Sequence, residues 1–433
     1  MVPKEEITTP NKLQSLQRTL YCKAKENKRW RAWSLYADLC RHDVLATALK
    51  TVVQNAGAAG VDGITTEDVK VTAETFLTDL QTQLREKSYR PSPVLRVWIP
   101  KADGKQRPLA IPTVKDRVVQ SALRLLLEPI FEADFHEASY GYRPGKSAHQ
   151  AIDAITRAML QGKSEVIDAD LSGYFDTINH AALLRLVARR VSDGSILRLV
   201  KLFLKAPIVE EKEGKRSIHP NDRGTPQGGV ISPLLANLYL NSLDHGVNDD
   251  PKLEAKLVRY ADDFVLLCRP GRGKVLYERL NDYLERKGLT LNTAKTRVLD
   301  VRRESFQFLG FRLAWRRSWR TGNYYPMVEP SPRARQKLRD SVRAHLNHWT
   351  TSKSCVATVA AVNRSVRGWS NYFHFGNSTK AFAQEQYWLR QRLRRWLWRK
   401  YGRTHGLYTF FTDARLHGQY KLFNLPTRAS HLR

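Results

Sequence analysis

The sequence contains few cysteines, and none of them form a close pair. The four cysteines are spread over 433 residues, at Cys22, Cys40, Cys268 and Cys355. Disulfide frameworks and zinc sites built from cysteines both require thiols at short spacings, so we expect neither. Scattered thiols are instead typical of a protein that stays in the reducing cytosol.

Long apolar runs are also missing. No stretch of about 18 uncharged apolar residues occurs, so we expect no helix that spans a membrane and no membrane partner. Residues 1–10 contain no basic head followed by an apolar run, and therefore do not resemble a secretory signal. These absences together predict a cytoplasmic protein.

Acidic residues are scarce relative to basic ones. Asp and Glu number 42 whereas Lys and Arg number 72, which gives a formal net charge of +30. A chain this basic usually binds a polyanion, and nucleic acid is the commonest one. A solvated basic surface is the alternative, but the remaining acids cluster in motifs. We therefore predict nucleic-acid binding that weakens as the salt concentration rises.

Apolar periodicity predicts the order of the first elements. Residues 13–53 show helical spacing with few breakers, and a second amphipathic helix is expected over 67–87. Residues 94–112 alternate as a β-hairpin does. A long helix is then expected after Thr113, and Pro129 should stop it or kink it.

Acidic residues interrupt two apolar segments farther along the chain. A buried strand is expected over 165–171 and carries Asp170, while apolar runs on both sides of Asp262-Asp263 predict a hairpin with acids at its tip. A lone Asp-Asp pair is usually a solvated turn, but carboxylates buried among apolar residues need a partner charge. Nucleotidyl transfer commonly uses two divalent ions held by such carboxylates.

Three blocks in order resemble the motifs of reverse transcriptases encoded by group II introns. Residues 170–176 resemble the first palm motif, 224–237 are similar to the T-P-Q-G-G motif, and 260–263 are similar to the Y-x-D-D box. Further blocks resemble the same family at 56–63, 99–113, 139–148, 291–296 and 308–311. The resemblance covers roughly residues 30–400.

This resemblance implies an α+β fold: a right-hand polymerase with fingers and an antiparallel-sheet palm, followed by an α-helical thumb or maturase domain. A fall in acids and a rise in Arg and Trp after Pro330 agree with a boundary there. The expected parts are a helical extension with the start of the fingers at 1–90, fingers and palm at 91–325, the thumb at 326–405, and a short basic tail at 406–433.

The resemblance also implies a metal site and a primer grip. Asp170, Asp262 and Asp263, with the backbone carbonyl of Leu171, are implied to hold two Mg²⁺ ions, for which Mn²⁺ would substitute. The turn at Leu309-Gly310 is implied to grip the primer, with core packing of 308–311 as the alternative.

The residues implied to bind the incoming nucleotide are Lys101, Arg107, Phe175, Gln227 and Lys295. Lys101 and Arg107 would hold the triphosphate, Phe175 would exclude a 2′-hydroxyl, and Gln227 would lie under the template base. The open alternatives are contacts to backbone phosphates for the two cations and core packing for Phe175.

A third set of residues is implied to bind RNA. Residues 362–373 resemble the L-N-x-x-x-R-G-W-x-x-Y-F block of the group II maturase (thumb) domain, and an Arg- and Trp-rich segment follows at 388–400. Arg and aromatic side chains together suit RNA. The implied residues are Arg364, Arg367, Trp369, Arg392, Arg394 and Arg395. The alternative is a thumb that only holds the template–primer duplex.

The function implied is that of an RNA-directed DNA polymerase that copies intron RNA into cDNA and also assists splicing and mobility. Its partners would be group II intron RNA, template RNA, a DNA primer or target DNA, and deoxynucleoside triphosphates. The protein would be a monomer or dimer. It would act in the bacterial cytoplasm, and at the nucleoid when its substrate is DNA. Because only Cys355 lies beyond residue 300, we expect the endonuclease-lacking bacterial type, which needs another primer source.

Three rival functions stay open. The first is a splicing maturase with little polymerase activity, against which the presence of Asp170, Asp262 and Asp263 argues. The second is a domesticated reverse transcriptase in phage defence or CRISPR adaptation, against which the block at 362–373 argues. The third is an RNA-binding module without enzymatic activity, against which the paired acids Asp262 and Asp263 argue.

Overall fold

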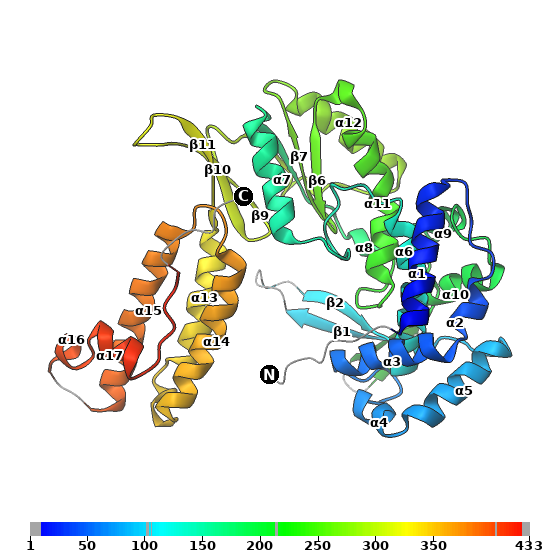
Figure 1. Cartoon of the computed structure of the whole chain (residues 1–433), viewed down its shortest axis with the longest axis horizontal. Coiled ribbons are helices and arrows are strands. Elements are labelled where there is room, and N and C mark those ends of the chain that lie inside the picture. Colours follow the sequence, from blue (N-terminus) through cyan, green and yellow to red (C-terminus); the bar gives the residue numbers. More distant parts are fainter. Residues whose placement is uncertain (1–9, 101–103, 105, 213–214, 403–404, 427–433) are drawn as a thin grey trace. The chain divides into compact units, whose positions relative to one another are not determined.

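The chain divides into two compact units in the computed structural model, which describes residues 10–100, 104, 106–212, 215–402 and 405–426. Lys101 lies outside the described residues. The first unit comprises Met1–Ser147, Ala169–Leu266 and Lys274–Arg297, and the second comprises Ala148–Asp168, Leu267–Gly273 and Val298–Arg433. Figure 1 follows the chain through both units by colour.

The N-terminal segment of the first unit is helical, as the spacing over 13–53 predicted, but it is divided into separate helices. The helices are α1 (Asn11–Glu26), α2 (Leu35–Leu39) and α3 (His42–Asn55). A distant residue ends α1, because the Arg190 guanidinium donates to the carbonyls of Ala24 and Asn27, at 3.0 and 2.8 Å. Ala32 then forms a parallel bridge with Val191.

The next helical segment is also divided. The helix expected over 67–87 is instead α4 (Thr66–Val71) and α5 (Ala73–Arg85), separated at Thr72. Thr65 and Asp68 form a capping box at the start of α4, an arrangement that satisfies free N–H groups at a helix N-terminus.

The helix after Thr113 continues through its proline. Helix α6 spans Val114–Glu132 with Pro129 inside it. Proline has no N–H, so the carbonyl four residues earlier, at Leu125, loses its helical partner. The side-chain amide of Gln17 in α1 donates to that carbonyl at 2.9 Å. A neighbouring helix therefore supplies the missing hydrogen bond.

The predicted hairpin over 94–112 is confirmed. Strands β1 (Val94–Pro100) and β2 (Gln106–Ile111) pair antiparallel, with Ile99 opposite Arg107. They belong to a sheet of order β2-β1-β4-β5, in which β4 (Ile208–Lys212) runs parallel to β1 and antiparallel to β5 (Lys215–His219).

Further helices complete the first unit. Asp193 caps one of them, α10, by accepting hydrogen bonds from the backbone amides of Ser195 and Ile196. The set comprises α8 (Tyr174–Thr177), α9 (His180–Ala188), α10 (Gly194–Leu204), α11 (Ser232–Asn248), the 3-10 helix η1 (Pro251–Leu253) and α12 (Gly273–Arg286), whose first residue belongs to the second unit.

A four-stranded sheet carries the candidate acids. Its order is β6-β7-β3-β8, formed by β6 (Lys256–Tyr260), β7 (Asp263–Cys268), β3 (Glu165–Ala169) and β8 (Arg297–Asp300). Both strand predictions are confirmed, although β3 ends at Ala169. Asp170 therefore lies directly after the end of β3 and is half-buried.

The second unit combines a small sheet with helices. The sheet has the order β11-β10-β9, formed by β11 (Tyr324–Pro330), β10 (Phe311–Arg317) and β9 (Phe306–Phe308). The boundary expected between 325 and 326 falls inside β11. The helices are α7 (Ala148–Leu160), α13 (Pro332–His345), the 3-10 helix η2 (Trp349–Ser352), α14 (Cys355–Phe373), α15 (Thr379–Lys400), α16 (Leu407–Phe410) and α17 (Asp413–Gly418).

Helices α13, α14 and α15 lie side by side (Figure 1). Trp396 of α15 is almost completely buried, and its indole N–H donates to the Thr350 hydroxyl at 3.0 Å. The predicted α+β class with a helical C-terminal region is confirmed. Across the part of the chain that the structure covers, no helix combines the length and apolar character needed to cross a membrane.

Candidate polymerase active site

Asp170 lies against the loop at 289–296. Its carboxylate accepts hydrogen bonds from the Asn292 amide and the Lys295 ammonium, each at 3.1 Å. The backbone amide of Asn292 also donates to the Asp170 carbonyl at 2.8 Å. Lys295, predicted to bind the nucleotide, is thereby placed beside a predicted metal ligand.

Leu171 is buried and forms an isolated antiparallel bridge with Leu291. The two backbone hydrogen bonds at this bridge run from Ser172 to Thr290, at 2.9 Å, and from Asn292 to Asp170. Neither bond uses the Leu171 carbonyl. Its predicted role as a metal ligand stays a prediction.

Asp262 sits at the tip of the hairpin formed by β6 and β7. The turn residue before it, Ala261, has φ of 61°, a left-handed conformation that a residue with a Cβ adopts only under tertiary constraint. Asp262 is half-buried, whereas Asp263 begins β7 and is exposed. The two neighbouring carboxylates therefore have different surroundings.

A buried charge network holds this hairpin from behind. The Arg259 guanidinium donates to both Asp244 carboxylate oxygens, at 2.8 and 2.5 Å, and to the Asn237 side chain and the Ala261 carbonyl, each at 2.8 Å. The Arg259 and Asp244 side chains are both 0% exposed. Burial alone would lower the pKa of Arg259, but the ion pair with Asp244 outweighs it and raises that pKa.

The backbone at Gly141 packs closely against the same turn. Gly141 approaches so closely that a Cβ there would lie 2.4 Å from the Ala261 nitrogen, and the Asn237 amide donates to the Gly141 carbonyl at 2.8 Å. Asn237, Asp244 and Arg259 were not among the residues predicted from the sequence. The signals were an arginine inside an apolar strand and two polar residues seven apart, which share one face of a helix.

Electrostatics tie Asp262 to Asp170. Burial raises the pKa of the Asp262 carboxyl, and repulsion from Asp170 adds to the rise, while Arg107 and Arg259 oppose it. Two carboxylates that repel each other in a partly desolvated place favour a cation between them.

The fit to a metal ion rests on that pair. Among the residues with described positions, no group of three or more His, Cys, Asp or Glu side chains is arranged to hold a metal by itself. Magnesium usually takes one or two carboxylates and completes its shell with waters and substrate phosphates. Asp170 and Asp262 fit such an ion, because its charge would relieve their repulsion.

Two of the predicted nucleotide-binding residues, Arg107 and Gln227, meet beside β2. Arg107 donates through Nε to the Gln227 side-chain oxygen at 2.8 Å, and the Gln227 amide donates to Asp176 at 3.3 Å. The Ala110 amide also donates to the Gln227 carbonyl at 2.6 Å. The structure therefore brings Arg107 and Gln227 together, whereas Lys101 is outside the described residues.

Glycines permit the close approach of the T-P-Q-G-G segment. At Gly228 the φ is 118°, and a Cβ would lie 2.3 Å from the Ala110 carbonyl oxygen; at Gly224 it would lie 2.7 Å from the Phe175 carbonyl oxygen. Phe175 is buried, at 7% exposure. Its predicted contact with the sugar stays a prediction.

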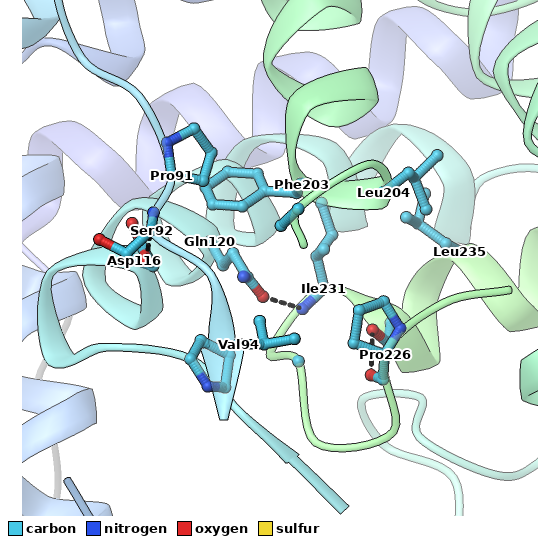
Figure 2. A pocket seen from close by; sticks show the side chains of 14 residues that line it. Pro91, Ser92, Val94, Asp116, Gln120, Phe203, Leu204, Pro226, Ile231 and Leu235 are labelled. Atoms are coloured by element: carbon cyan, nitrogen blue, oxygen red, sulfur yellow. Dashed lines mark hydrogen bonds between the residues drawn. The ribbon is translucent and has the colours of Figure 1, made fainter. Parts of the chain in front are cut away.

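A small cavity lies beneath this segment (Figure 2). It measures about 10 Å³, room for a single water at most, and Gln120 and Ile231 meet across it at 3.4 Å. Asp116, at its edge, accepts hydrogen bonds from the Tyr89 hydroxyl at 2.5 Å and the Ser92 amide at 3.0 Å. This cavity is a packing feature of the unit.

In the second unit, the predicted primer grip is a tight turn between β9 and β10. Leu309 has φ of 50° and Gly310 has φ of 81°, and Phe308 pairs with Phe311 across the turn. Two central residues with positive φ define the type I′ turn, which matches the twist of a hairpin.

The predicted RNA-binding residues of the second unit divide into exposed and buried sets. Arg364, Arg367 and Arg395 are exposed, and Arg392 is half-buried. Arg394 is instead buried, with an ion pair to Asp413 and a 2.8 Å hydrogen bond to the Phe411 carbonyl.

Trp369 also takes part in packing. Its indole N–H donates to the Ala334 carbonyl at 3.2 Å, and its ring lies 5.1 Å from the rings of both Phe373 and Phe382. The structure thus shows contacts inside the domain for Trp369, and its predicted contact with RNA stays a prediction.

A groove of about 440 Å³ between α13 and α15 gathers further cations. Arg392 and Arg395 line it, together with Arg339 and Arg343, which stack over Trp388 at 5.5 and 5.8 Å. Arg339 and Arg343 were not among the residues predicted from the sequence to bind RNA. Their spacing of four residues, which places side chains on one helical face, was the available signal.

Two family models match the chain. A reverse transcriptase (RNA-dependent DNA polymerase) model matches residues 99–313, and a group II intron maturase-specific domain model matches residues 322–412.

Individual proteins match as well. Protein YkfC of Escherichia coli (strain K12) is 34% identical over 345 residues, which cover 71% of this chain and 89% of YkfC. Group II intron-encoded protein LtrA of Lactococcus lactis subsp. cremoris is 37% identical over 211 residues, 48% of this chain, so the chain spans only 34% of LtrA. A solved structure, a partial Cas6-RT-Cas1--Cas2 complex, matches at 23% identity over 58% of this chain and 42% of that chain, with a TM-score of 0.37, too distant to carry an argument.

Proposed function

Because this chain belongs to the reverse transcriptases encoded by group II introns, we propose that Asp170, Asp262 and Asp263 hold the divalent ions of an RNA-directed DNA polymerase. The observation that carries the proposal is geometric: Asp262 lies at the tip of the hairpin formed by β6 and β7, and Asp170 directly follows β3, the strand beside β7. Burial and repulsion from Asp170 both raise the pKa of Asp262, in agreement with this placement. We assign Mg²⁺ as the ion, with Mn²⁺ as a substitute, because hard carboxylate oxygens suit both.

The chain's own residues position the reactants. Arg107 presents a guanidinium fork suited to a triphosphate, and its hydrogen bond to Gln227 orients it. Lys295 pairs with Asp170 at 3.1 Å, and we assign its ammonium to a phosphate of the incoming nucleotide. Phe175, held beside the T-P-Q-G-G segment, is assigned to exclude the 2′-hydroxyl.

When bound, the two ions supply Lewis acidity for attack of the primer 3′-hydroxyl and neutralise charge on the departing pyrophosphate. The buried Arg259–Asp244 pair keeps the Asp262 turn in place during this step. Such preorganised positioning accounts for much of the rate enhancement in enzymes of this type.

We further propose that the second unit binds group II intron RNA and so assists splicing. Exposed Arg364 and Arg367, and the groove lined by Arg392 and Arg395, support this assignment. The complete activity would use intron RNA as template, a DNA primer and deoxynucleoside triphosphates in the bacterial cytoplasm. Residues 326–405 would form the maturase domain.

The deciding experiment is primer extension on an RNA template with deoxynucleotides and Mg²⁺. Wild type is compared with Asp262→Asn and with Asp282→Asn, a matched change at an exposed position of α12. Extension by wild type and Asp282→Asn, with none by Asp262→Asn, supports the proposal. If wild type binds structured RNA tightly but extends no primer, the polymerase assignment fails and a splicing maturase takes its place.

A further inference from the structure

The turn at Leu309-Gly310 is held in a conformation that its sequence does not favour. Leu309 carries a Cβ and still adopts a positive φ, which L-residues other than glycine rarely do. A neighbouring group must therefore compensate for the strain if the turn is to stay in one conformation.

Helix α14 supplies that group. The Tyr372 hydroxyl donates to the Leu309 carbonyl at 3.0 Å. The next residue, Phe373, covers the turn so closely that a Cβ on Gly310 would lie 3.2 Å from its ring. The Ser331 amide donates to the Gly310 carbonyl at 2.9 Å. Both carbonyls of the turn are thus tied to the surrounding unit.

Tyr372 is itself anchored. The Tyr372 carbonyl can only accept a hydrogen bond, so His149 Nε2 donates to it, at 2.6 Å. The His149 ring stacks on Phe375 at 4.8 Å and 9°, and the Tyr372 ring lies 5.5 Å from Phe311. An aromatic cluster from α7, β10 and the end of α14 therefore fixes the direction of the Tyr372 hydroxyl.

We propose that Tyr372 is a positioning residue for the primer terminus, acting through the Leu309 carbonyl. The inference rests on the proposed polymerase function and on the primer-grip role of Leu309-Gly310. It assigns to the block at 362–373, which resembles a maturase motif, a second role in DNA synthesis. A site must be held to within about 0.5 Å to place a reacting group well, and the Tyr372 hydroxyl restrains the Leu309 side of this turn.

The test is Tyr372→Phe, which removes the hydroxyl but keeps the ring and its contacts. Tyr372 is 36% exposed, so water can reach the released carbonyl and the variant should fold. Tyr401→Phe, which removes a tyrosine hydroxyl near Tyr420 in the same unit, is the matched control. Steady-state primer extension is measured with the primer–template and the deoxynucleotide varied separately.

We expect the KM for primer–template to rise by about threefold to tenfold in Tyr372→Phe, the effect of losing one hydrogen bond. The KM for deoxynucleotide and the melting temperature should stay at wild-type values, and Tyr401→Phe should match wild type throughout. Equal primer–template KM values in Tyr372→Phe and wild type would overturn the proposal. The proposal would also be overturned if a lower melting temperature fully explained the rise in the KM for primer–template.

Hydrogen exchange provides a readout that needs no catalysis. In Tyr372→Phe, amide exchange in the peptide over 306–313 and at Ser331 should become faster than in wild type and in Tyr401→Phe. Unchanged exchange there would overturn the positioning role even in an active enzyme. If wild type extends no primer but the exchange changes as expected, the polymerase proposal fails while the restraint by Tyr372 stands.

Discussion

The acid-bearing hairpin of the first unit and the arginine-rich helices of the second use charge in opposite ways. Behind the hairpin, Arg259 and Asp244 are completely buried and satisfy each other. In the helices, Arg392 and Arg395 line an open groove whose described lining contains no acid. Charge that is paired and buried positions a site, whereas unpaired charge at a surface is available to a polyanion.

The few acids of the second unit sharpen this contrast. Glu385 is 1% exposed and accepts from Arg335 and Arg339, at 2.6 and 2.8 Å, and Asp413 pairs with Arg390 and Arg394. These acids are used to join helices. An arginine in this region is therefore available to RNA only where no acid faces it.

The largest expected effect is a loss of catalysis at the hairpin while the hairpin keeps its fold. Asp262→Asn removes a metal ligand, which we expect to lower primer extension by about 10³-fold or more, since metal-ion stabilisation supplies several kcal/mol. Binding of structured RNA by the second unit should be unchanged. Extension rates and RNA affinity are measured on the same preparation, and a parallel fall in both would contradict the division of roles.

The next effect concerns stability. Asp244→Asn leaves the buried Arg259 without its partner, so we expect the free energy of unfolding to fall by about 3–5 kcal/mol. The matched change Asp340→Asn affects an ion pair of 47% and 58% exposed side chains in α13, where we expect about 1 kcal/mol or less. Chemical denaturation gives both values. Equal losses of unfolding free energy in the two variants would show that the buried ion pair stabilises the protein no more than the exposed one.

A third prediction tests the groove. Arg392→Gln combined with Arg395→Gln should weaken RNA binding and lower the slope of log affinity against log salt by about 1.4, from about 0.7 for each phosphate contact. The rate of extension at saturating primer–template should not change. The control is Lys274→Gln with Arg279→Gln, which changes two exposed positions of α12. The same salt slope in both double variants would show that the groove is not part of the RNA-binding surface.

The smallest effect is a pH dependence. Because the folded-state pKa of Asp262 is raised by burial, ionising this carboxyl without a cation costs stability. Below the ordinary pKa of 3.8 the carboxyl is protonated in both the folded and the unfolded protein, so the cost is absent. The cost grows as the pH rises from there, and reaches its full size above the raised pKa of the folded state. Asp262→Asn should therefore be more stable than wild type at neutral pH without Mg²⁺, and equal to it in acid. Thermal melts across pH measure the difference, and Mg²⁺ should reduce it.

Local patterns predicted most elements that depend on neighbours in the chain. The hairpin over 94–112 and the strands next to Asp170 and Asp262 follow from period-two alternation and apolar runs. The errors fell where a distant residue decides the outcome. Arg190 ends α1, and Gln17 supports α6 across Pro129; neither contact is visible in a local window.

The candidate site shows the same division. Order and spacing of motifs pointed to Asp170, Asp262, Arg107 and Gln227. The structure joins Arg107 to Gln227 by a hydrogen bond. It places Asp170 directly after β3 and Asp262 directly before β7, which are neighbours in one sheet. Sequence reasoning placed Arg394 with the RNA-binding arginines, although the structure uses it to hold Asp413. A basic run alone does not say which guanidinium already has a partner.

By itself, the sequence determined the chemistry available to this protein: its excess of basic residues, its three aspartates at the ends of apolar strands, and its membership of a polymerase family whose motifs occur in order. Only the tertiary structure decided how those groups are held. Asn237, Asp244 and Arg259 meet behind the hairpin, and Tyr372 meets Leu309. Contacts between residues far apart in the chain depend on packing, and packing is settled only when the whole unit folds.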